Sequence, residues 1–585
     1  ISAARSVIGV QNAKLTVTGS GKIYETSPYF GAIIIKGSDN AENKDYTVVT
    51  VGAGVELEGW SPIFVDQYKG CAYGVAVNVD GAKLTGKTDT SGDRGSAIYV
   101  NGTIKDQNNA PKLVLNNVTQ TTEGTGMYLA GYANTTITGG SITGGNTGIE
   151  IRAGELTVDG ATVVGNGVPT EVTPNGNGST TDGAGIAVAQ HTTKLPIKVT
   201  INSGDISGYS ALYQSNPQKN DAESVKKVSV AVNGGTFKAI NGGTVSVYSE
   251  NNCVAVTGGT FSADPSAFVT DTNLVVVPNV GKTEFTVQPK TSQEGNTTTT
   301  TEVSEDGKTV TETKTETTTD GNTVTKTETN LDTGKITEDK TVTKTESKKD
   351  GNVETKTTTV TKTKTEDGKV AVSTETVTTE KTENGGTTTV VTKKDTLNKT
   401  ETTEVTGVTA PTTAADVTLD VKNTSSVAVD KAAMTALTNE KVKDVIIETD
   451  QATLKLDKTA VKTMESKVAA DGKDKMTLNV KVTEEKNASK TEIEKIMVEV
   501  TAVNEAGQNM FPKDTEKTNG KITITIPYTG TATQLDLWYT TDSGSIYMGR
   551  FSVVNGFVSF DVKHFSRYDL LPVSSSGSGV ASGSS

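Results

Sequence analysis

The stretch GIEIRAGELTVDG, residues 148–160, decides the fold of the amino-terminal half of the chain. It holds two phrases, Ile149-Glu150-Ile151 and Leu156-Thr157-Val158, each with apolar residues flanking a polar one. In a strand, the flanking residues lie on one face and the middle residue lies on the other. Strands this short bury their apolar faces only when successive repeats stack on one another. The stretch therefore predicts one coil of a larger stack.

Both phrases recur through residues 1–290 and alternate along the chain, with turns rich in Gly, Asn and Asp between them. This alternation predicts a right-handed parallel β-helix. An antiparallel β-sandwich is the alternative, although its hairpins would not alternate two kinds of phrase. Insertions at 169–183 and 214–227, rich in turn-forming residues, should protrude. The first phrase lies at 15–17, 77–79, 113–115, 156–158, 199–201, 230–232 and 254–256, and the second at 33–35, 63–65, 98–100, 127–129, 149–151 and 186–188.

Two further stretches, Asn233-Gly234-Gly235-Thr236-Phe237 and residues 256–266 (VTGGTFSADPS), carry a resemblance to a known group. They resemble the β-helix coils of surface proteins from Gram-positive, Clostridia-like bacteria. The resemblance concerns repeat phrasing over about half of the chain, and it implies architecture more than activity.

Residues 291–409 are dominated by Thr, Glu and Lys and have few apolar residues, so they cannot build a packed core. One alternative is a single-layer antiparallel meander with Thr ladders on one face and Lys/Glu pairs on the other. The other is a disordered spacer. Either makes this segment a stalk, and similar stretches occur in the same bacterial proteins. Hairpin turns are predicted at Asp306-Gly307, Asp320-Gly321, Thr333-Gly334, Asp350-Gly351, Asp367-Gly368 and Asn384-Gly385.

Residues 410–573 regain an apolar pattern that predicts a β-sandwich-like module. Asp430 can cap a helix that turns Ala433, Met434 and Leu437 inward, and Asp457 can cap a second with Val461, Met464 and Val468 on one side. Strands are expected at 476–482, 496–503, 522–526, 535–539 and 557–562.

The end of this module, with residues 524–528, 537–539 and His564-Phe565-Ser566-Arg567-Tyr568, resembles a module of Gram-positive surface proteins. Residues 574–585 contain Ser, Gly, Val and Ala alone, which is typical of a linker. Neither a sortase-type Leu-Pro-x-Thr-Gly motif nor an S-layer-homology repeat is present, so the sequence leaves the mode of anchoring open.

The sequence shows no arrangement of residues that predicts an active site, and neither a metal nor a cofactor is expected. Polysaccharide-cleaving β-helices use clustered carboxylates and a basic residue. Here only Glu150 and Arg152 could be paired in that way, and we expect a solvated surface ion pair instead. His191 falls in a polar turn, and His564 is expected to be a packed structural residue. With only two histidines, in separate domains, His-based catalytic and metal sites are disfavoured.

The best candidate site is a stripe of outward side chains, one from each of successive coils: Ile34, Phe64, Tyr99 and Tyr128. Stacked at the strand spacing of about 4.8 Å, they would form a platform for sugar rings or for an apolar patch of a partner. The alternative is that the stacked rings stabilise the sheet or lie beneath a loop.

Together these features predict a secreted protein of the cell surface or cell wall that presents a β-helix head on a stalk, with a glycan or a host or neighbouring-cell protein as partner. A self-associating filament or surface-layer subunit is one alternative, and a polysaccharide lyase or hydrolase is another. The net charge of −13 disfavours nucleic acid as a partner. No apolar run is long enough for membrane insertion. Cys71 and Cys253 are expected to be free, partly buried thiols, and a disulfide between them is the alternative.

Overall fold

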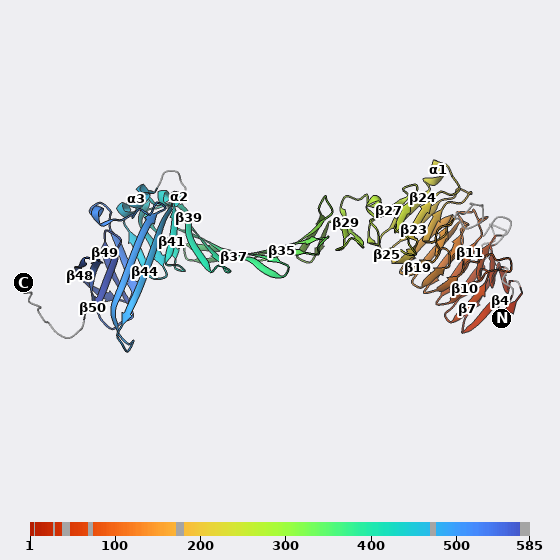
Figure 1. Ribbon diagram of the computed structural model, residues 1–585, viewed down its shortest axis with the longest axis horizontal. Coiled ribbons are helices and arrows are strands. Elements are labelled where there is room, and N and C mark those ends of the chain that lie inside the picture. The colour runs from red at the N-terminus through yellow and green to blue at the C-terminus, as the bar shows by residue number, and fades with distance from the viewer. Residues whose placement is uncertain are drawn as a thin grey trace, which may run out of the picture. The chain divides into compact units, whose positions relative to one another are not determined.

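The computed structural model describes residues 1–4, 6–26, 30–37, 47–67, 74–170, 181–468 and 475–573 (Figure 1). Cys71 and the predicted linker at 574–585 lie outside the described residues. The chain divides into two compact units. The first comprises Ile1–Gln293, Thr299–Glu312 and Glu328–Ile336, and the second comprises Glu294–Thr298, Thr313–Thr327 and Thr337–Ser585.

The first unit is built from three parallel sheets, and each strand pairs with the strand that comes three places later in the chain. Sheet A contains β1 (Ser2–Ala3), β4 (Gly21–Glu25), β7 (Val55–Gly59), β10 (Lys83–Gly86), β13 (Thr119–Thr122), β16 (Ser141–Gly144), β19 (Ala161–Gly165), β22 (Gly204–Gly208), β25 (Thr236–Ala239) and β28 (Gly259–Phe261). Sheet B contains β2 (Ile8–Gln11), β5 (Ile33–Lys36), β8 (Ile63–Asp66), β11 (Ile98–Val100), β14 (Met127–Leu129), β17 (Ile149–Ile151), β20 (Ala184–Ala189), β23 (Ser210–Ser215) and β26 (Val247–Ser249). Sheet C contains β3 (Lys14–Val17), β6 (Thr47–Val51), β9 (Val75–Asp80), β12 (Lys112–Asn116), β15 (Ala133–Thr138), β18 (Gly154–Asp159), β21 (Ile197–Ile201), β24 (Val228–Val232) and β27 (Val254–Val256).

This pairing is compatible with a β-helix-like solenoid, and it contradicts the antiparallel sandwich because neighbouring strands run parallel. The parallel stack of sheet A ends at β28, which pairs antiparallel with β30 (Phe285–Pro289). β30 then pairs antiparallel with β29 (Leu274–Pro278), next to the short 3-10 helix η1 (Ser266–Phe268).

The core of the first unit is lined by the outer residues of the two predicted phrases. Ile149 and Ile151 of sheet B and Leu156 and Val158 of sheet C are fully or almost fully buried. Sheet A supplies a third strand to each repeat, which the phrases did not predict. Its strands are harder to recognise because many of them bring one large apolar residue to the core, as Ile142 does in β16.

The insertion at 214–227 lies at the outer margin of the first unit (Figure 1), with Glu223 and Lys226 exposed, and it is also anchored to the sheets. It contains α1 (Ala222–Val225), which is capped by Asp221, and Val225 is buried. Asn220 anchors the segment, because its side-chain amide donates hydrogen bonds to the side-chain oxygen of Gln190 and to the carbonyl oxygen of His191, both at 3.0 Å. Most of the other insertion, residues 171–180, lies outside the described residues.

Residues 291–409 form strands, as the meander alternative requires, and β35 to β39 pair antiparallel with their neighbours in order. The predicted Gly turns lie at or beside the strand ends. Asp367-Gly368 and Asn384-Gly385 make two-residue turns with positive φ at both positions. The strands are β31 (Thr291–Glu294), β32 (Thr297–Val303), β33 (Thr309–Thr318), β34 (Gly321–Asn330), β35 (Ile336–Asp350), β36 (Val353–Glu366), β37 (Lys369–Glu383), β38 (Gly386–Asp395) and β39 (Thr400–Thr409).

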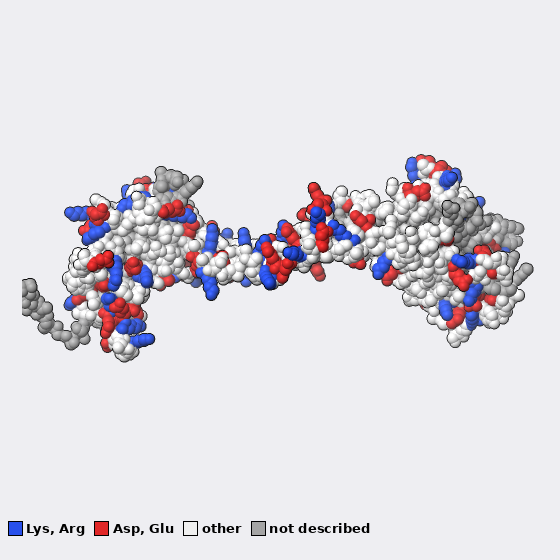
Figure 2. Space-filling model, in the orientation of Figure 1, with Lys and Arg blue, Asp and Glu red and all other residues white. Residues whose placement is uncertain are grey.

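The predicted division into a Thr face and a Lys/Glu face is wrong. Directly paired residues share a face of the sheet, and Thr359 is paired with Lys344 on one side and with Val377 on the other. On the opposite face, Thr345 is paired with Thr358. Each face therefore mixes Thr with charged and apolar residues. Figure 2 shows Lys and Arg interspersed with Asp and Glu along these strands.

The module that follows contains two connected sheets whose side chains share one core with both helices. One sheet has the order β40-β42-β43-β46-β49 and the other β39-β41-β44-β45-β50-β47-β48, which is compatible with the expected sandwich-like module. The elements are β40 (Ala415–Val421), β41 (Ser426–Asp430), α2 (Lys431–Leu437), β42 (Val442–Thr449), β43 (Thr453–Leu456), α3 (Lys458–Ser466), β44 (Lys475–Lys486), β45 (Ile493–Asn504), the 3-10 helix η2 (Lys513–Thr515), β46 (Ile522–Pro527), β47 (Gln534–Thr541), β48 (Gly544–Val554), β49 (Phe557–Val562) and β50 (Arg567–Pro572).

Both predicted helix caps are confirmed. Asp430 accepts a hydrogen bond from the backbone N–H of Ala433, and Asp457 accepts one from that of Ala460. Val468 is buried as expected but lies just beyond the end of α3. Among the described residues, no helix is long and apolar enough to cross a membrane.

Candidate functional site

The middle residues of the sheet B strands form one continuous row on the face that points away from the core. Pairing of successive strands in register aligns them one above the next. We call this set the outer row. Its members, in order, are Gly9, Ile34, Phe64, Tyr99, Tyr128, Glu150, Ala187, Tyr213 and Tyr248.

The predicted stripe forms the first part of the outer row, and its aromatic rings stack. Ring centroids are 4.9 Å apart for Phe64 and Tyr99, and 5.3 Å apart for Tyr99 and Tyr128. The Trp60 ring lies 5.6 Å from that of Tyr99. Phe64 and Tyr128 are 8% and 4% exposed, whereas Ile34 and Tyr99 are half-buried. The stripe therefore contributes strongly to sheet packing. Its role in binding stays a prediction, and only Ile34 and Tyr99 are accessible enough to contact a ligand.

The middle of the outer row is charged and buried, which corrects the expectation of a solvated Glu150–Arg152 pair. Neither side chain has measurable exposure. Arg152 donates from Nη1 to the hydroxyl oxygen of Tyr128 and from Nε to the carbonyl oxygen of Ala189, both at 3.3 Å. Burial raises the pKa of Tyr128, and the charge of Glu150 raises it further. A group without solvent access cannot receive a polysaccharide, so this pair acts in packing.

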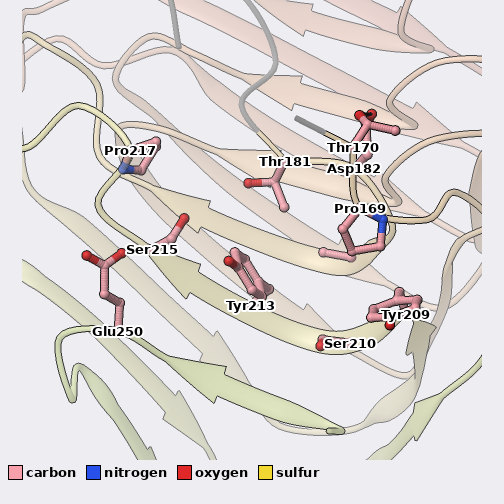
Figure 3. Close-up of a pocket in the computed structure, with 11 residues that line it drawn as sticks. Pro169, Thr170, Thr181, Asp182, Tyr209, Ser210, Tyr213, Ser215, Pro217 and Glu250 are labelled. Carbon is pink, nitrogen blue, oxygen red and sulfur yellow. Dashed lines mark hydrogen bonds between the residues drawn. The ribbon is translucent and has the colours of Figure 1, made fainter. Parts of the chain in front are cut away.

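The last part of the outer row is open to solvent. The rings of Tyr213 and Tyr248 stack with centroids 4.9 Å apart and an interplanar angle of 17°, and Tyr248 is 40% exposed. Tyr213 lines a pocket of about 320 Å³ (Figure 3). The pocket is lined by Pro169, Thr170, Thr181, Asp182, Ala184, Tyr209, Ser210, Tyr213, Ser215, Pro217 and Glu250.

Two carboxylates are held at this pocket by hydrogen bonds. Glu250 accepts one from the backbone N–H of Asn216 at 2.7 Å, and Asp182 accepts one from the hydroxyl of Thr170 at 2.7 Å. Burial raises the pKa of Tyr213, and Tyr248 and Glu250 raise it further. The pocket thus combines an aromatic surface, fixed negative charge and hydroxyl groups, which is a lining suited to a polar ligand with a ring face.

Sequence reasoning missed Tyr213 and Tyr248, although a signal for them is present. Each follows an apolar residue that comes after a serine, Ser210 or Ser246, as Tyr99 does after Ser96, but the third residue of each phrase, Gln214 or Ser249, is polar. The strand that contains Tyr213 was not recognised, because the predicted insertion begins at residue 214. The pocket itself could not be predicted, because Pro169 and Glu250 come together only through the register of the sheets.

Among the described residues, the two histidines, Cys253 and the possible metal ligands add no second site. His564 is packed as expected, 2% exposed and with its ring centroid 4.7 Å from that of Tyr539. His191 lies in the predicted turn after β20, where its carbonyl oxygen accepts a hydrogen bond from the backbone N–H of Lys194 at 3.0 Å. Its side chain is buried, and its Nδ1 accepts a hydrogen bond from the backbone N–H of Thr193 at 3.2 Å. Cys253 is a free, half-buried thiol, as predicted. Over the described ranges, no group of three or more His, Cys, Asp or Glu side chains could hold a metal ion.

Comparison with known proteins adds no further assignment: no family model, no curated protein and no solved structure matches this chain. The chain is thus defined by its own features. They are a mainly β architecture, long parallel sheets in the first unit, and an outer row that ends in an accessible aromatic pair beside a pocket.

Proposed function

We propose that this chain is a secreted bacterial cell-surface protein that binds glycans through a right-handed parallel β-helix head. In all three sheets, each strand pairs with the strand three places later in the chain. This supports the solenoid, because a chain that winds through sheets B, C and A in turn produces that pairing. The right hand follows from the general rule that about 98% of crossovers between parallel strands of one sheet are right-handed.

The single observation that carries glycan binding is the stacked Tyr213–Tyr248 pair beside the pocket, in which Tyr248 is exposed and Tyr213 is half-buried. Aromatic faces pack well against the apolar C–H faces of sugar rings, and nearby carboxylates and hydroxyls accept and donate hydrogen bonds to sugar hydroxyls. Because both rings are partly exposed, they contribute little to the packed core of the first unit. We therefore assign the ligand to this end of the outer row and away from the buried Phe64 and Tyr128.

Secretion, surface attachment and the stalk role of residues 291–409 are supported by the resemblance to Gram-positive surface proteins and by composition. The strands β33 to β37, rich in Thr, Lys and Glu, have no fully buried side chain and suit a spacer, whereas Val390 of β38 and Val405 of β39 belong to the core of the module. The enzyme alternative, a polysaccharide lyase or hydrolase, gains no support from Glu150 and Arg152, because both are buried.

The test of glycan binding is an array of bacterial and host glycans, followed by binding to whole cells. Tyr213→Ala together with Tyr248→Ala should abolish at least about nine-tenths of the binding, since stacking against aromatic faces is the main contact proposed. Tyr24→Ala is the matched control, because Tyr24 is an exposed tyrosine of β4 in the same unit and lies outside the outer row. Tyr99→Ala tests the predicted stripe separately. Unchanged binding by the Tyr213/Tyr248 variant would refute the assignment of the site.

A self-assembling subunit remains a second candidate because β48 has a largely free edge. Among the described residues, Gly544–Ser552 pair only with β47, and their other edge carries exposed Ile546 and Tyr547. Such an edge can pair with a strand of another chain. If the protein forms filaments or oligomers in electron micrographs, Ile546→Lys should disperse them. Monomers at high concentration would argue against this candidate.

A further inference from the structure

We propose that the pocket beside Tyr213 selects a positively charged amino sugar, that is, a pyranose with a free ammonium group, over neutral and acidic sugars. This inference rests on the proposed glycan-binding function and names the ligand class for the same site. The carrying observations are the charges that line the pocket, their position relative to the Tyr213 ring, and the size of the pocket.

The charge of the lining is one-sided. Among the described residues that line the pocket, Asp182 and Glu250 are ionisable acids, and none is Lys, Arg or His. Both acids are oriented by the hydrogen bonds described above, from Thr170 and from the backbone N–H of Asn216. Oriented carboxylates at the rim of a partly enclosed pocket attract a cation more strongly than carboxylates in open water do.

The ring of Tyr213 lies between the two carboxylates in Figure 3, with Glu250 on one side and Asp182 with Thr170 on the other. Tyr213 and Glu250 are close enough for the charge of Glu250 to raise the pKa of the phenol. The substituents of a sugar ring stacked on Tyr213 would thus point toward the carboxylate of Glu250 on one side and that of Asp182 on the other. An ammonium substituent would gain a charge-assisted hydrogen bond there and attraction to the aromatic face.

The remaining lining suits the rest of a sugar. The hydroxyls of Ser210, Ser215 and Thr181 can exchange hydrogen bonds with sugar hydroxyls, and Pro169 and Pro217 add apolar surface. A volume of about 320 Å³ lies at the small end of the range of roughly 300–1,000 Å³ typical of ligand pockets. The pocket therefore fits one monosaccharide unit, and adjacent units of a chain would lie outside it, along the exposed Tyr248.

Acidic sugars should be rejected for the same reason. A uronic acid or a sulfated sugar would bring a second negative charge next to Glu250 or Asp182, with no basic lining residue to neutralise it. An N-acetylated amino sugar keeps the ring face and loses the positive charge, so it should bind by stacking alone.

The experiment is isothermal titration calorimetry of the whole protein at low ionic strength and slightly acidic pH. The probes are a glucosamine tetrasaccharide, its fully N-acetylated counterpart and a galacturonic acid tetrasaccharide. We expect the glucosamine probe to bind about tenfold more tightly than the N-acetylated probe, and the uronic acid probe not to bind measurably. Added salt should reduce the preference, because the contribution is electrostatic.

Glu250→Gln together with Asp182→Asn should remove the preference and leave the affinity for the N-acetylated probe nearly unchanged. Glu223→Gln is the matched control, since Glu223 is an exposed acid of the same unit outside the pocket lining. A different result would be that the N-acetylated or uronic acid probe binds as tightly as the glucosamine probe or more tightly, and loses this binding in the Tyr213/Tyr248 variant. That result would overturn the charge selection and uphold the glycan site. Binding of none of the probes or array glycans in a Tyr213-dependent way would overturn the proposed function itself.

Discussion

At the scale of single residues, Arg152 decides how the middle of the outer row is packed. It is among the largest fully buried side chains, and it lies two residues after Glu150, which is also fully buried. Glu150 is paired across the sheet with Tyr128, whose hydroxyl accepts a hydrogen bond from Arg152. Burying charge is unfavourable unless opposite charges and hydrogen bonds accompany it. Arg152 therefore stabilises the stack by supplying positive charge beside Tyr128 and Glu150.

Arg152→Met should destabilise the first unit by about 3 kcal/mol or more, because it leaves a buried carboxylate without this nearby positive charge. The measurement is the midpoint of urea unfolding, followed by fluorescence. Arg94→Met is the matched control. Arg94 is exposed and donates a hydrogen bond to the side-chain oxygen of Asn146 at 2.9 Å, so its loss should change the midpoint little. Equal effects of the two variants would contradict a packing role for Arg152.

His564 makes the stability of the second unit depend on pH. Burial of its ring lowers its pKa from the ordinary value of 6.5, the charge of Lys513 lowers it further, and Glu516 partly opposes this. The unfolded chain, with the ordinary pKa, therefore takes up more protons than the folded chain as the pH falls. The stability of the second unit should be complete above about pH 6.5 and should decrease below it.

The measurement is urea unfolding of the second unit at several pH values between neutral and mildly acidic. His564→Asn should lower stability at every pH but flatten the decrease below pH 6.5. His191→Asn, a change of the buried histidine of the first unit, should leave the profile of the second unit unaltered. A profile that keeps its slope in the His564 variant would assign the dependence to other groups.

At the scale of elements, glycines at the ends of the sheet A strands allow each repeat to turn into the next. Gly59, Gly86, Gly144 and Gly165 lie at the same position of β7, β10, β16 and β19, with Thr122 of β13 between them in register. A Cβ atom on Gly144 would come within 1.9 Å of the carbonyl oxygen of Thr147. A Cβ atom on Gly165 would come within 2.0 Å of that of Ala184. Backbone segments thus approach too closely at this corner for a side chain.

Gly165→Ala should accordingly destabilise the first unit by about 1–3 kcal/mol or more, since the backbone must shift to admit the methyl group. Thermal unfolding followed by circular dichroism measures the change. Gly9→Ala is the matched control, because nothing lies within 4 Å of the position of its Cβ. If Gly165→Ala were as stable as Gly9→Ala, the corner would be looser than the structure indicates.

The composition of these strands explains which parts of the fold could be predicted from the sequence alone. Sheets B and C were predicted because each strand places two apolar residues in the core around a middle residue, as in Ile149-Glu150-Ile151. Sheet A was missed because a strand such as Ser141–Gly144 has one large apolar residue and ends at a glycine required by the corner. The turns of 291–409 were predictable from local Gly chemistry. Its faces were not, because cross-strand register decides which residues share a face.

The candidate site was predictable only in part, for a related reason. The in-register alignment of Phe64, Tyr99 and Tyr128 follows from the repeat, and the structure has it. Exposure does not follow from the repeat, since it depends on what covers each position. Trp60 packs on one end of this stack, whereas Tyr248 is left open. Accessibility, and with it the location of the pocket, emerges only from the three-dimensional arrangement.

At the scale of the whole molecule, the residues that the structure describes form two separate large hydrophobic cores, and none of these residues belongs to both. One is built from the parallel sheets of the first unit and contains Leu57 of β7. The other belongs to the carboxyl-terminal module and contains Leu454 of β43. Cooperative unfolding requires shared buried contacts, so chains with separate cores commonly unfold in more than one step.

Calorimetry of the intact protein should therefore resolve two transitions, and core substitutions should assign them. Leu57 and Leu454 have no measurable exposure, so changing either to Ala should destabilise its own unit by about 2–5 kcal/mol through lost burial and the cavity left behind. Leu57→Ala should lower the temperature of one transition and Leu454→Ala that of the other. A glucosamine ligand that binds at Tyr213 should raise only the transition that Leu57→Ala lowers, because a ligand stabilises the cooperative unit that holds its site. A single transition that both substitutions shift would instead mean that the two cores unfold as one cooperative unit.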